Sequence, residues 1–207
     1  MTLTIQRLGS ADADAFERAL GIYREAIEPS EQRTEAELWA ALGREDYLIL
    51  AALRGQAVVG FVIAFLPDRE DVWLLEYVAT ASSERGQGTG ERLVRETSLA
   101  AKGRIGLVEV DEPHGGADTI TARRVRFYRR LGCRQIDALS YLLPLRTHGL
   151  PPPMLMLAFA PDGVDSIPAN TIERWLRVIY VEVYGQRADD PRIAQMTGRL
   201  PANTPLI

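Results

Sequence analysis

The sequence predicts an α/β protein of the α+β kind, with a mixed, mostly antiparallel central sheet flanked by helices. Three apolar segments, 47–53, 57–65 and 72–80, are joined by short polar connections, and such connections require antiparallel neighbours. The third segment runs into a glycine-rich turn and then into a helix with apolar residues at helical spacing. The apolar segment 104–110 follows, after a connection long enough for a right-handed crossover to a parallel partner. The predicted sheet is therefore mixed.

Further elements are predicted before this region. Residues 3–8 form a strand, and residues 10–28 form a helix that Ser10 can cap. A second, short helix covers 34–42 and ends at a glycine. Five glutamates gather near these helices, and we interpret most of them as a solvated helix face, although they could also attract a cationic amine.

The C-terminal part continues with a predicted hairpin and an extension. Strands over 141–145 and 154–159 form the hairpin, around a loop that contains His148. A helix then begins near Asn170 with a pattern like a capping box, and it is apolar on two sides. We expect it to pack on the domain and on a second subunit; its β-branched residues leave a strand as the alternative. The tail 188–207 is expected to be weakly ordered at its end.

Composition limits the class of protein. The 207 residues are 46% hydrophobic and 25% charged, which indicates a soluble globular protein of one large domain, or one domain with an appendage. The net charge is -4, so no basic field favours nucleic acid as a partner. No apolar run is long enough to span a membrane, and the first residues do not have the pattern of a signal peptide, so we expect a cytoplasmic protein. The single cysteine, Cys133, offers neither an intramolecular disulfide nor a metal cluster.

The glycine-rich turn is the strongest functional signal. Gly86, Gly88 and Gly90 lack a Cβ and let the backbone approach a ligand, while a helix that begins here presents N–H groups without intrahelical partners. This arrangement suits a phosphate or pyrophosphate; the alternative is a tight turn without a ligand. The spacing does not fit a dinucleotide fingerprint, and no Lys with Ser or Thr follows the last glycine as in a P-loop.

The pattern Arg85-x-x-Gly88-x-Gly90 resembles the acetyl-coenzyme A binding motif, [RQ]-x-x-G-x-[GA], of the GNAT (Gcn5-related) N-acetyltransferase superfamily. The order of elements also resembles that family, with a second strand RIGLVEV and then a helix TARRVRFYRRLGC, in which Tyr128 stands four residues before Gly132. The resemblance covers about residues 47 to 160. It implies the GNAT acyltransferase fold, with an acetyltransferase domain over 1–160 and a C-terminal helical extension over 161–207.

The resemblance also implies acetyl-coenzyme A as cosubstrate and a set of residues that bind it. Backbone groups at the end of the central strand would hold the pantetheine arm, and the turn would hold the pyrophosphate. Thr121 stands where many members have an Asn near the start of the tyrosine helix. The candidate cofactor-binding residues are Val78, Ala79, Thr80, Arg85, Gly86, Gln87, Gly88, Thr89, Gly90 and Thr121.

Two residues are candidates for catalysis. Glu76 lies nine residues before Arg85, where histone-acetylating members of the family carry a glutamate base, and its strand position predicts a face opposite to that of Tyr77. Glu76 could instead be a structural carboxylate bonded to Tyr or Arg. Tyr128 matches the family's general acid, which protonates the coenzyme A thiolate; the alternative is a core tyrosine. The acidic loop 111–118 has no standard metal-ligand spacing, so we predict no metal.

We therefore predict transfer of an acetyl group from acetyl-coenzyme A to a primary amine by direct attack. A small molecule is the expected acceptor, and a protein N-terminus or lysine is the alternative. A non-catalytic domain that binds an acyl-coenzyme A as a sensor or interaction module is the competing hypothesis. A homodimer through the C-terminal helix is the expected assembly.

Overall fold

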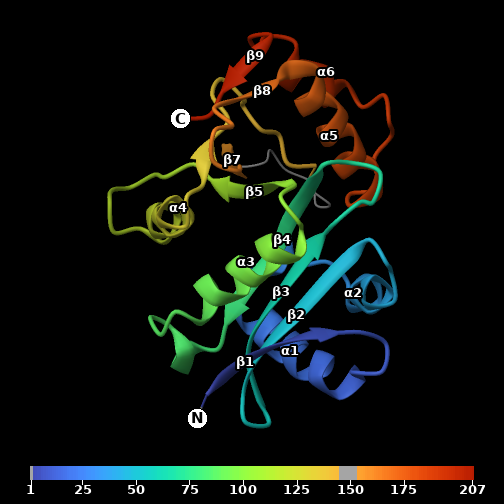
Figure 1. Ribbon diagram of the computed structural model, residues 1–207, viewed down its shortest axis with the longest axis vertical. Coiled ribbons are helices and arrows are strands. Elements are labelled where there is room, and N and C mark those ends of the chain that lie inside the picture. Colours follow the sequence, from blue (N-terminus) through green and yellow to red (C-terminus); the bar gives the residue numbers. More distant parts are fainter. Residues whose placement is uncertain (1, 145–152) are drawn as a thin grey trace. The chain divides into compact units, whose positions relative to one another are not determined.

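The computed structural model describes residues 2–144 and 153–207, which divide into two compact units, 1–103 and 104–207 (Figure 1). Both units contain helices and strands, and the paired strands within each unit are antiparallel. The predicted class, a mixed α/β fold with a mostly antiparallel sheet and flanking helices, is confirmed.

Unit 1 is a four-stranded antiparallel arrangement in the order β1-β2-β3-β4. All five strand and helix positions predicted in this half up to residue 65 are present, with ends that differ by a few residues. The elements are β1 (Leu3–Leu8), α1 (Ala13–Ala26), η1 (Pro29–Glu31), α2 (Glu35–Leu42), β2 (Tyr47–Arg54), β3 (Ala57–Phe65), β4 (Val72–Thr80), η2 (Ser82–Glu84) and α3 (Thr89–Ala100).

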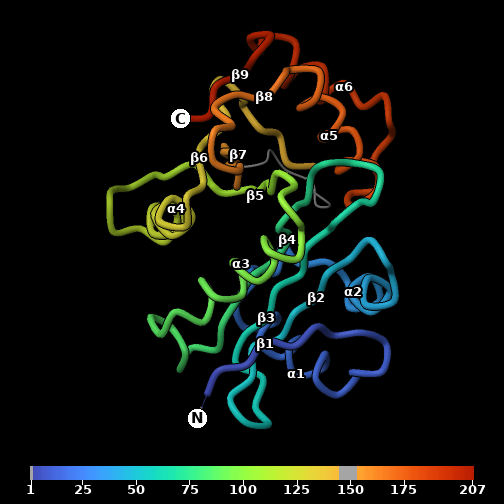
Figure 2. Tube along the Cα trace, in the orientation of Figure 1, coloured from blue at the N-terminus to red at the C-terminus, as the bar shows by residue number. Residues whose placement is uncertain are grey.

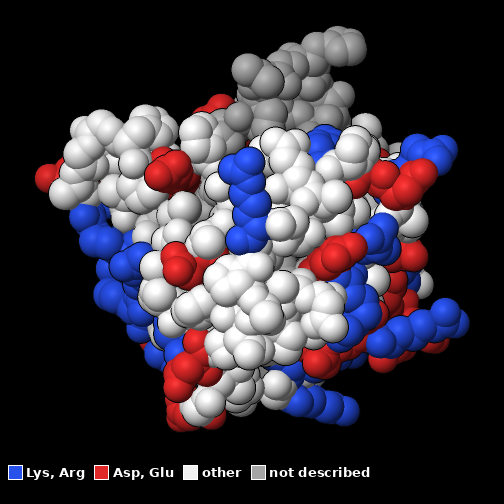
Figure 3. Space-filling model, turned by 90° about the horizontal axis from the view of Figure 1, so that it is seen from above, with Lys and Arg blue, Asp and Glu red and all other residues white. Residues whose placement is uncertain are grey.

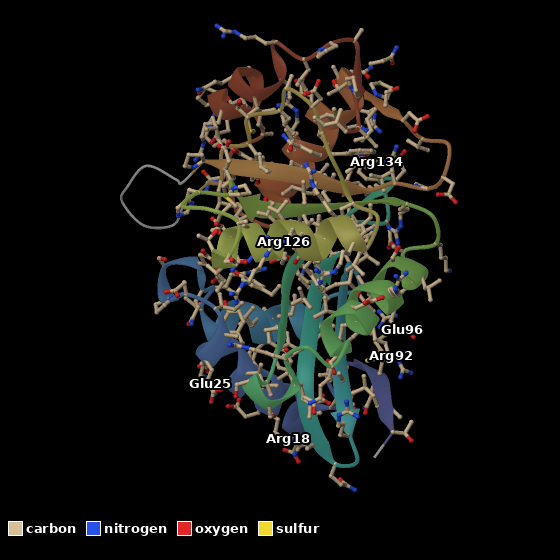
Figure 4. The ribbon with its side chains drawn as sticks, turned by 90° about the vertical axis from the view of Figure 1, so that its left-hand side faces the viewer. Arg18, Glu25, Arg92, Glu96, Arg126 and Arg134 are labelled. Carbon is tan, nitrogen blue, oxygen red and sulfur yellow. The ribbon has the colours of Figure 1, made fainter. Side chains whose placement is uncertain are left out.

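Helices cover both faces of these four strands. α1 packs against β3 and β4, and α3 packs against β2, β3 and β4. Figure 4 shows Glu25 of α1 on one side of the strands and Arg92 and Glu96 of α3 on the other. Because both faces are covered, β2 and β3 are buried along most of their length. This explains why both strands are nearly continuous apolar runs rather than alternating ones.

Unit 2 pairs β5, β7 and β6 in that order, all antiparallel, and adds a short β8–β9 ribbon (Figure 2). α4 packs against β5, and α5 packs against α6 and β8. The elements are β5 (Ile105–Asp111), α4 (Ile120–Arg130), β6 (Arg134–Gln135), β7 (Met154–Phe159), β8 (Ser166–Pro168), α5 (Ala169–Glu182), α6 (Pro191–Thr197) and β9 (Asn203–Pro205).

The predicted C-terminal hairpin is only partly present. β7 has the predicted bounds, but of the predicted strand 141–145 only Tyr141 pairs, through an isolated bridge to Met154. β7 pairs instead with β5 and with β6, a strand of two residues too short for a pattern of alternation to reveal. Leu145 and the predicted loop 146–150 lie outside the described residues.

Two helix starts differ from the prediction. α1 begins at Ala13 rather than near Ser10, and the carboxylate of Asp12 accepts a hydrogen bond from the N–H of Gly9 at 2.9 Å. α5 begins at Ala169 after Pro168, so Asn170 lies inside the first turn and does not cap it. At α1 the start is set by the hydrogen bond between Gly9 and Asp12. At α5 it is set by Pro168, whose φ is fixed.

The end of the chain is ordered, contrary to the prediction. α6 and β9 lie within the segment expected to be weakly ordered, and Leu206 is 7% exposed. The N–H of Gln135 donates to the carbonyl of Ile207 at 2.7 Å, and the N–H of Ile207 donates back to Gln135 at 2.9 Å. The tail is therefore held by backbone pairing with a segment about 70 residues earlier. Among the described residues, no helix is long and apolar enough to cross a membrane.

Candidate active site

The glycine-rich turn has the backbone form that the sequence predicts. Gly86 and Gly88 both have φ 78°, a left-handed conformation that favours glycine. Gly88 is the N-cap of α3. Because glycine has no side chain, it cannot accept a hydrogen bond from the first N–H groups of α3. Gly86 and Gly88 are exposed, and a Cβ built on either would meet no atom within 4 Å. The turn thus offers an open set of N–H donors at a helix N-terminus, which fits a pyrophosphate.

Not every residue of the turn is free to donate its N–H. The N–H of Arg85 donates to the carbonyl of Ser82 at 3.4 Å, and that of Gln87 to Glu84 at 3.2 Å. The side chain of Gln87 is also occupied, because its Nε2 donates to the carbonyl of Ser83 at 2.7 Å. Arg85 carries an exposed side chain. Within the described residues, no backbone hydrogen bond uses the N–H groups of Gly86, Gly88 and Gly90, so the turn can present these three; Thr89 is buried.

The strand segment proposed for the pantetheine arm is paired along one edge. Val78, Ala79 and Thr80 of β4 are half-buried and lie opposite residues 60–62 of β3. In an antiparallel pair, only alternate residues of a strand direct their N–H and C=O to a given neighbour. The remaining backbone groups of this segment point to the other edge of β4.

Glu76 lies at a β-bulge. Ile63 of β3 pairs with Tyr77, while the next residue, Ala64, pairs with Leu75, so Glu76 is the extra residue on β4. The bulge breaks the regular alternation of side chains. Glu76 bonds Arg33, and the hydroxyl of Tyr77 donates to the carbonyl of Glu31 at 2.9 Å. The prediction that Glu76 and Tyr77 face opposite ways is therefore wrong, because both reach the segment before α2.

Arg33 is the partner of Glu76. Its Nη1 donates to Oε2 of Glu76 at 2.8 Å and to the hydroxyl of Tyr47 at 3.0 Å. The side chains of Arg33 and Glu76 are 10% and 4% exposed, so this is a buried ion pair. Oε1 of Glu76 is buried, and among the described residues it has no hydrogen-bond partner. A buried carboxylate oxygen without a donor is costly and is a natural acceptor for a ligand N–H.

The burial of Glu76 changes its acidity. Desolvation raises the pKa of the Glu76 carboxyl, and the Arg33 guanidinium opposes that rise. The N–H of Arg33 is held by the hydroxyl of Tyr23 at 2.8 Å, so its position is fixed by α1. A raised pKa makes the ionised carboxyl a stronger base, which suits a group that accepts a proton.

Tyr128 lies in unit 2, in the last turn of α4. It is 5% exposed, and its ring contacts those of Phe127 and Phe159, with centroids 5.1 and 6.2 Å away. Burial raises the pKa of the Tyr128 phenol, although Arg124 lowers it, so the hydroxyl keeps its proton at neutral pH. No residue of the described ranges is hydrogen-bonded to that hydroxyl. The Tyr128 hydroxyl is thus a protonated donor for which residues 2–144 and 153–207 supply no acceptor.

The Leu-Gly pair after Tyr128 ends α4. Gly132 has φ 91°, and its N–H donates to the carbonyl of Arg129 at 3.0 Å. The N–H of Cys133 donates to the carbonyl of Tyr128 at 3.1 Å. These two bonds form a Schellman motif, which explains why glycine stands at this position. The motif also fixes the backbone of Tyr128.

The rest of α4 is strongly basic. Thr121 is 7% exposed at the start of the helix, with its hydroxyl 3.2 Å from that of Thr119. Arg124 pairs with Asp111 at 3.0 Å. The other arginines of the helix are exposed, and they are Arg123, Arg126, Arg129 and Arg130. Figure 3 shows basic side chains along its left edge, the side on which Figure 1 places α4. Within the described residues, no group of three or more His, Cys, Asp or Glu could hold a metal ion.

Sequence reasoning missed several residues of these sites. Arg33 lies in an irregular segment without periodicity, and no local pattern connects it to Glu76, 43 positions later. Glu84 precedes the glycine motif and is 8% exposed, and it bonds Arg54 of the β2–β3 hairpin. In the sequence Glu84 is an acidic residue directly before the motif, and its burial, which marks it as unusual, is visible only in the structure.

Comparison with known proteins supports the resemblance. A model of the acetyltransferase (GNAT) family matches residues 13–133, more than half of the chain. No sequence among curated proteins matches significantly. A GNAT-family protein from Bacteroides thetaiotaomicron has the same fold, with 21% identity and a TM-score of 0.72 over 89% of this chain and 99% of that chain.

Two further solved structures of similar fold were determined with ligands. NAA60 from Arabidopsis thaliana in complex with acetyl-CoA has 17% identity and a TM-score of 0.58, over 78% of this chain and 100% of that chain. PaiA N-acetyltransferase from Thermoplasma acidophilum in complex with coenzyme A has 16% identity and a TM-score of 0.56, again over 78% and 100%. At these sequence identities, the structural similarity shows the fold alone.

Proposed function

Because this chain belongs to the GNAT acetyltransferase family, we propose that it transfers an acetyl group from acetyl-coenzyme A to a primary amine of a small molecule. Acetyl-coenzyme A is the cosubstrate of the family, and it supplies the acetyl thioester. The observation that carries the proposal is the turn at Gly86 and Gly88, whose left-handed glycines leave N–H donors open at the start of α3. We propose that these N–H groups bind the pyrophosphate and that Val78, Ala79 and Thr80 hold the pantetheine arm.

We propose Glu76 as the group that receives the ammonium proton, directly or through water. Its raised pKa and its unpartnered Oε1 both suit a base that meets an amine N–H. The ion pair with Arg33 also fits a purely structural carboxylate, which is the competing interpretation. The two interpretations predict different acetylation rates for a variant with a neutral residue in place of Glu76.

We propose Tyr128 as the group that protonates the departing thiolate. Its hydroxyl is protonated at neutral pH and has no acceptor among the described residues. Direct attack of the amine forms the new C–N bond as the C–S bond breaks, so one proton leaves the nitrogen and one must reach the sulfur. Glu76 and Tyr128 would supply these two proton transfers.

The proposed acceptor and the proposed assembly are argued from Glu76 and from α5. The buried carboxylate oxygen of Glu76 supports an amine, while a protein N-terminus or lysine remains the second candidate acceptor. A homodimer through α5 also stays a prediction. Ile172, Trp175 and Tyr180 of α5 are buried within unit 2, whereas Val178 and Val181 are half-buried.

Calorimetric titration with acetyl-coenzyme A, coenzyme A and NAD tests the cofactor site. We expect the first two to bind and NAD not to bind. A panel of amines is then incubated with acetyl-coenzyme A, and thiol release is recorded; the panel contains polyamines, amino sugars, and peptides with a free N-terminus or a free lysine. Thiol release with a small amine supports the proposal, whereas release with peptides alone would replace the small-molecule acceptor.

A sensor or interaction module is the outcome to be separated from an enzyme. Such a protein would bind acetyl-coenzyme A but release no thiol with any amine of the panel. Failure of acetyl-coenzyme A and coenzyme A to bind at all would overturn the cofactor site, and with it the roles proposed for Glu76 and Tyr128.

A further inference from the structure

The glycine turn is tied to the β2–β3 hairpin by a buried ion pair. Nε of Arg54, the last residue of β2, donates to both carboxylate oxygens of Glu84, at 2.9 and 3.0 Å. The side chains of Arg54 and Glu84 are 27% and 9% exposed. Glu84 is one of few buried charged residues, and burial of a carboxylate is stable only with a partner of this kind.

The same pair reaches the turn at two more points. Oγ1 of Thr89, the first residue of α3, donates to Oε2 of Glu84 at 3.1 Å. Nη2 of Arg54 donates to Oε1 of Gln87 at 3.1 Å. Glu84 just before the motif and Gln87 and Thr89 within it thus share one ion-pair network, although Arg54 lies 30 positions before Glu84.

The ion pair and its contacts with the turn affect ligand binding as well as packing. Gly86 and Gly88 have more backbone freedom than other residues, so an unsupported turn loses much conformational entropy when it binds a ligand. A turn that is already fixed loses less, and preorganisation of this kind increases affinity. The side chains of Arg54 and Glu84 hold Gln87, which lies between the two glycines, and Thr89, which follows Gly88.

We propose that Glu84, held by Arg54, is a positioning residue that fixes the glycine turn in the conformation that receives the pyrophosphate of acetyl-coenzyme A. The inference rests on the proposed function, because it concerns the same cofactor site. Glu84 contributes to cofactor binding through its contacts with the turn and with the first residue of α3. It is expected to affect the pyrophosphate-bearing part of the ligand and to leave the acetyl-pantetheine part unaffected.

Calorimetry with acetyl-coenzyme A, on the wild type and on Glu84→Gln, Arg54→Gln and the double variant, tests the proposal. We expect each single variant to bind about tenfold more weakly, because a charge-assisted contact is lost. The double variant should also be weakened only about tenfold, since either change alone releases the turn. Glu17→Gln, which removes an exposed ion pair with Arg24 within α1, is the matched control and should bind like the wild type.

A second ligand separates positioning from general damage. S-Acetylpantetheine lacks the pyrophosphate, and its binding, followed by NMR line broadening, should change less than twofold in every variant. Thermal unfolding identifies a temperature at which all variants are folded. Unchanged acetyl-coenzyme A binding by Glu84→Gln, equal weakening of both ligands, or about hundredfold weakening in the double variant would overturn the inference. A wild type that binds no acetyl-coenzyme A would instead overturn the proposed function.

Discussion

At the scale of single residues, the least expected feature is the contact between Glu76 and Arg33. A carboxylate within an apolar strand is noticeable in the sequence, but its partner is not. The bulge directs Glu76 and Tyr77 to the same segment, which a regular strand could not do. The pair fixes the carboxylate, while Oε1 has no donor in the part of the chain that the structure describes.

Replacement Glu76→Gln tests whether this carboxylate is the base. We expect kcat, measured per folded molecule with the best amine of the panel, to fall by about a hundredfold or more, because general base catalysis is lost. Stability should fall too, by about 3–5 kcal/mol, because Arg33 is left buried without its partner. Urea unfolding gives the second quantity. An unchanged kcat with lowered stability would assign Glu76 a structural role.

The pH dependence of the rate provides an independent test. Burial raises the pKa of Glu76, and only the ionised carboxyl accepts a proton, so kcat/KM should rise with pH through that raised pKa and then level off. Arg33→Met removes the cation that lowers this pKa, so the rise should move to higher pH. Because the folded state binds the proton more tightly, the contribution of Glu76 to stability is greatest at acid pH and is lost as pH rises through the raised pKa. A rise that does not move in Arg33→Met would contradict the assignment.

Replacement Tyr128→Phe distinguishes an enzyme from a sensor. The aromatic contacts with Phe127 and Phe159 are retained, so the protein should stay folded and bind acetyl-coenzyme A as before. Turnover should fall by about a hundredfold because the proton donor is absent. Calorimetry measures the binding and thiol release measures the turnover. Full turnover in Tyr128→Phe would remove the role proposed for this hydroxyl.

At the scale of elements, the ends of the helices carry most of the local information. Gly132 ends α4 by a Schellman motif, and Gly88 begins α3 with a left-handed backbone. Both depend on the backbone conformation of a few residues. The sequence predicted the glycine turn before α3, but the predicted helix 121–133 continued past Gly132, whereas α4 ends at Arg130. Strand β6, with two residues, and the ribbon of β8 with β9 carry no comparable local pattern.

Replacement Gly132→Ala tests the helix end. A side chain at φ 91° is strained by about 1–2 kcal/mol, so the melting temperature should fall by about 2–8 °C for a protein of this size. Gly21→Ala is the contrasting control. Gly21 lies within α1 and a Cβ there meets no atom within 4 Å, so alanine should stabilise the protein by up to about 1 kcal/mol. Scanning calorimetry measures both. Equal melting temperatures for Gly132→Ala and the wild type would contradict the motif's contribution.

At the scale of the whole molecule, the last residues of the chain are part of the folded structure. Leu206 and Thr204 are buried, and Ile207 exchanges backbone hydrogen bonds with Gln135. The carboxylate of Glu109 on β5 also accepts hydrogen bonds from Tyr141 and from Tyr184, which follows α5. The segment predicted as an extension is thus joined to the rest of unit 2 by polar as well as apolar contacts. The boundary predicted at residue 160 stays a prediction.

Removal of residues 203–207 tests the contribution of the tail. We expect the free energy of unfolding to fall by about 3 kcal/mol or more, from the burial of Leu206 and the loss of the β8–β9 pairing. Urea unfolding measures the change. Ile207→Ala is the control, because its side chain is 58% exposed and should contribute little. An unchanged unfolding midpoint in the truncated protein would mean that the tail is dispensable.

The sequence by itself determined the strands of unit 1, the glycine turn, and the helix that carries Tyr128. These features depend on backbone preferences and on apolar periodicity within about ten residues, so the order of residues encodes them directly. Only the tertiary structure decided the contact of Glu76 with Arg33, the bulge beneath it, the anchoring of the turn by Arg54, and the pairing of the tail. These depend on the register of strands and on contacts between residues 30 to about 70 positions apart, which no local pattern specifies.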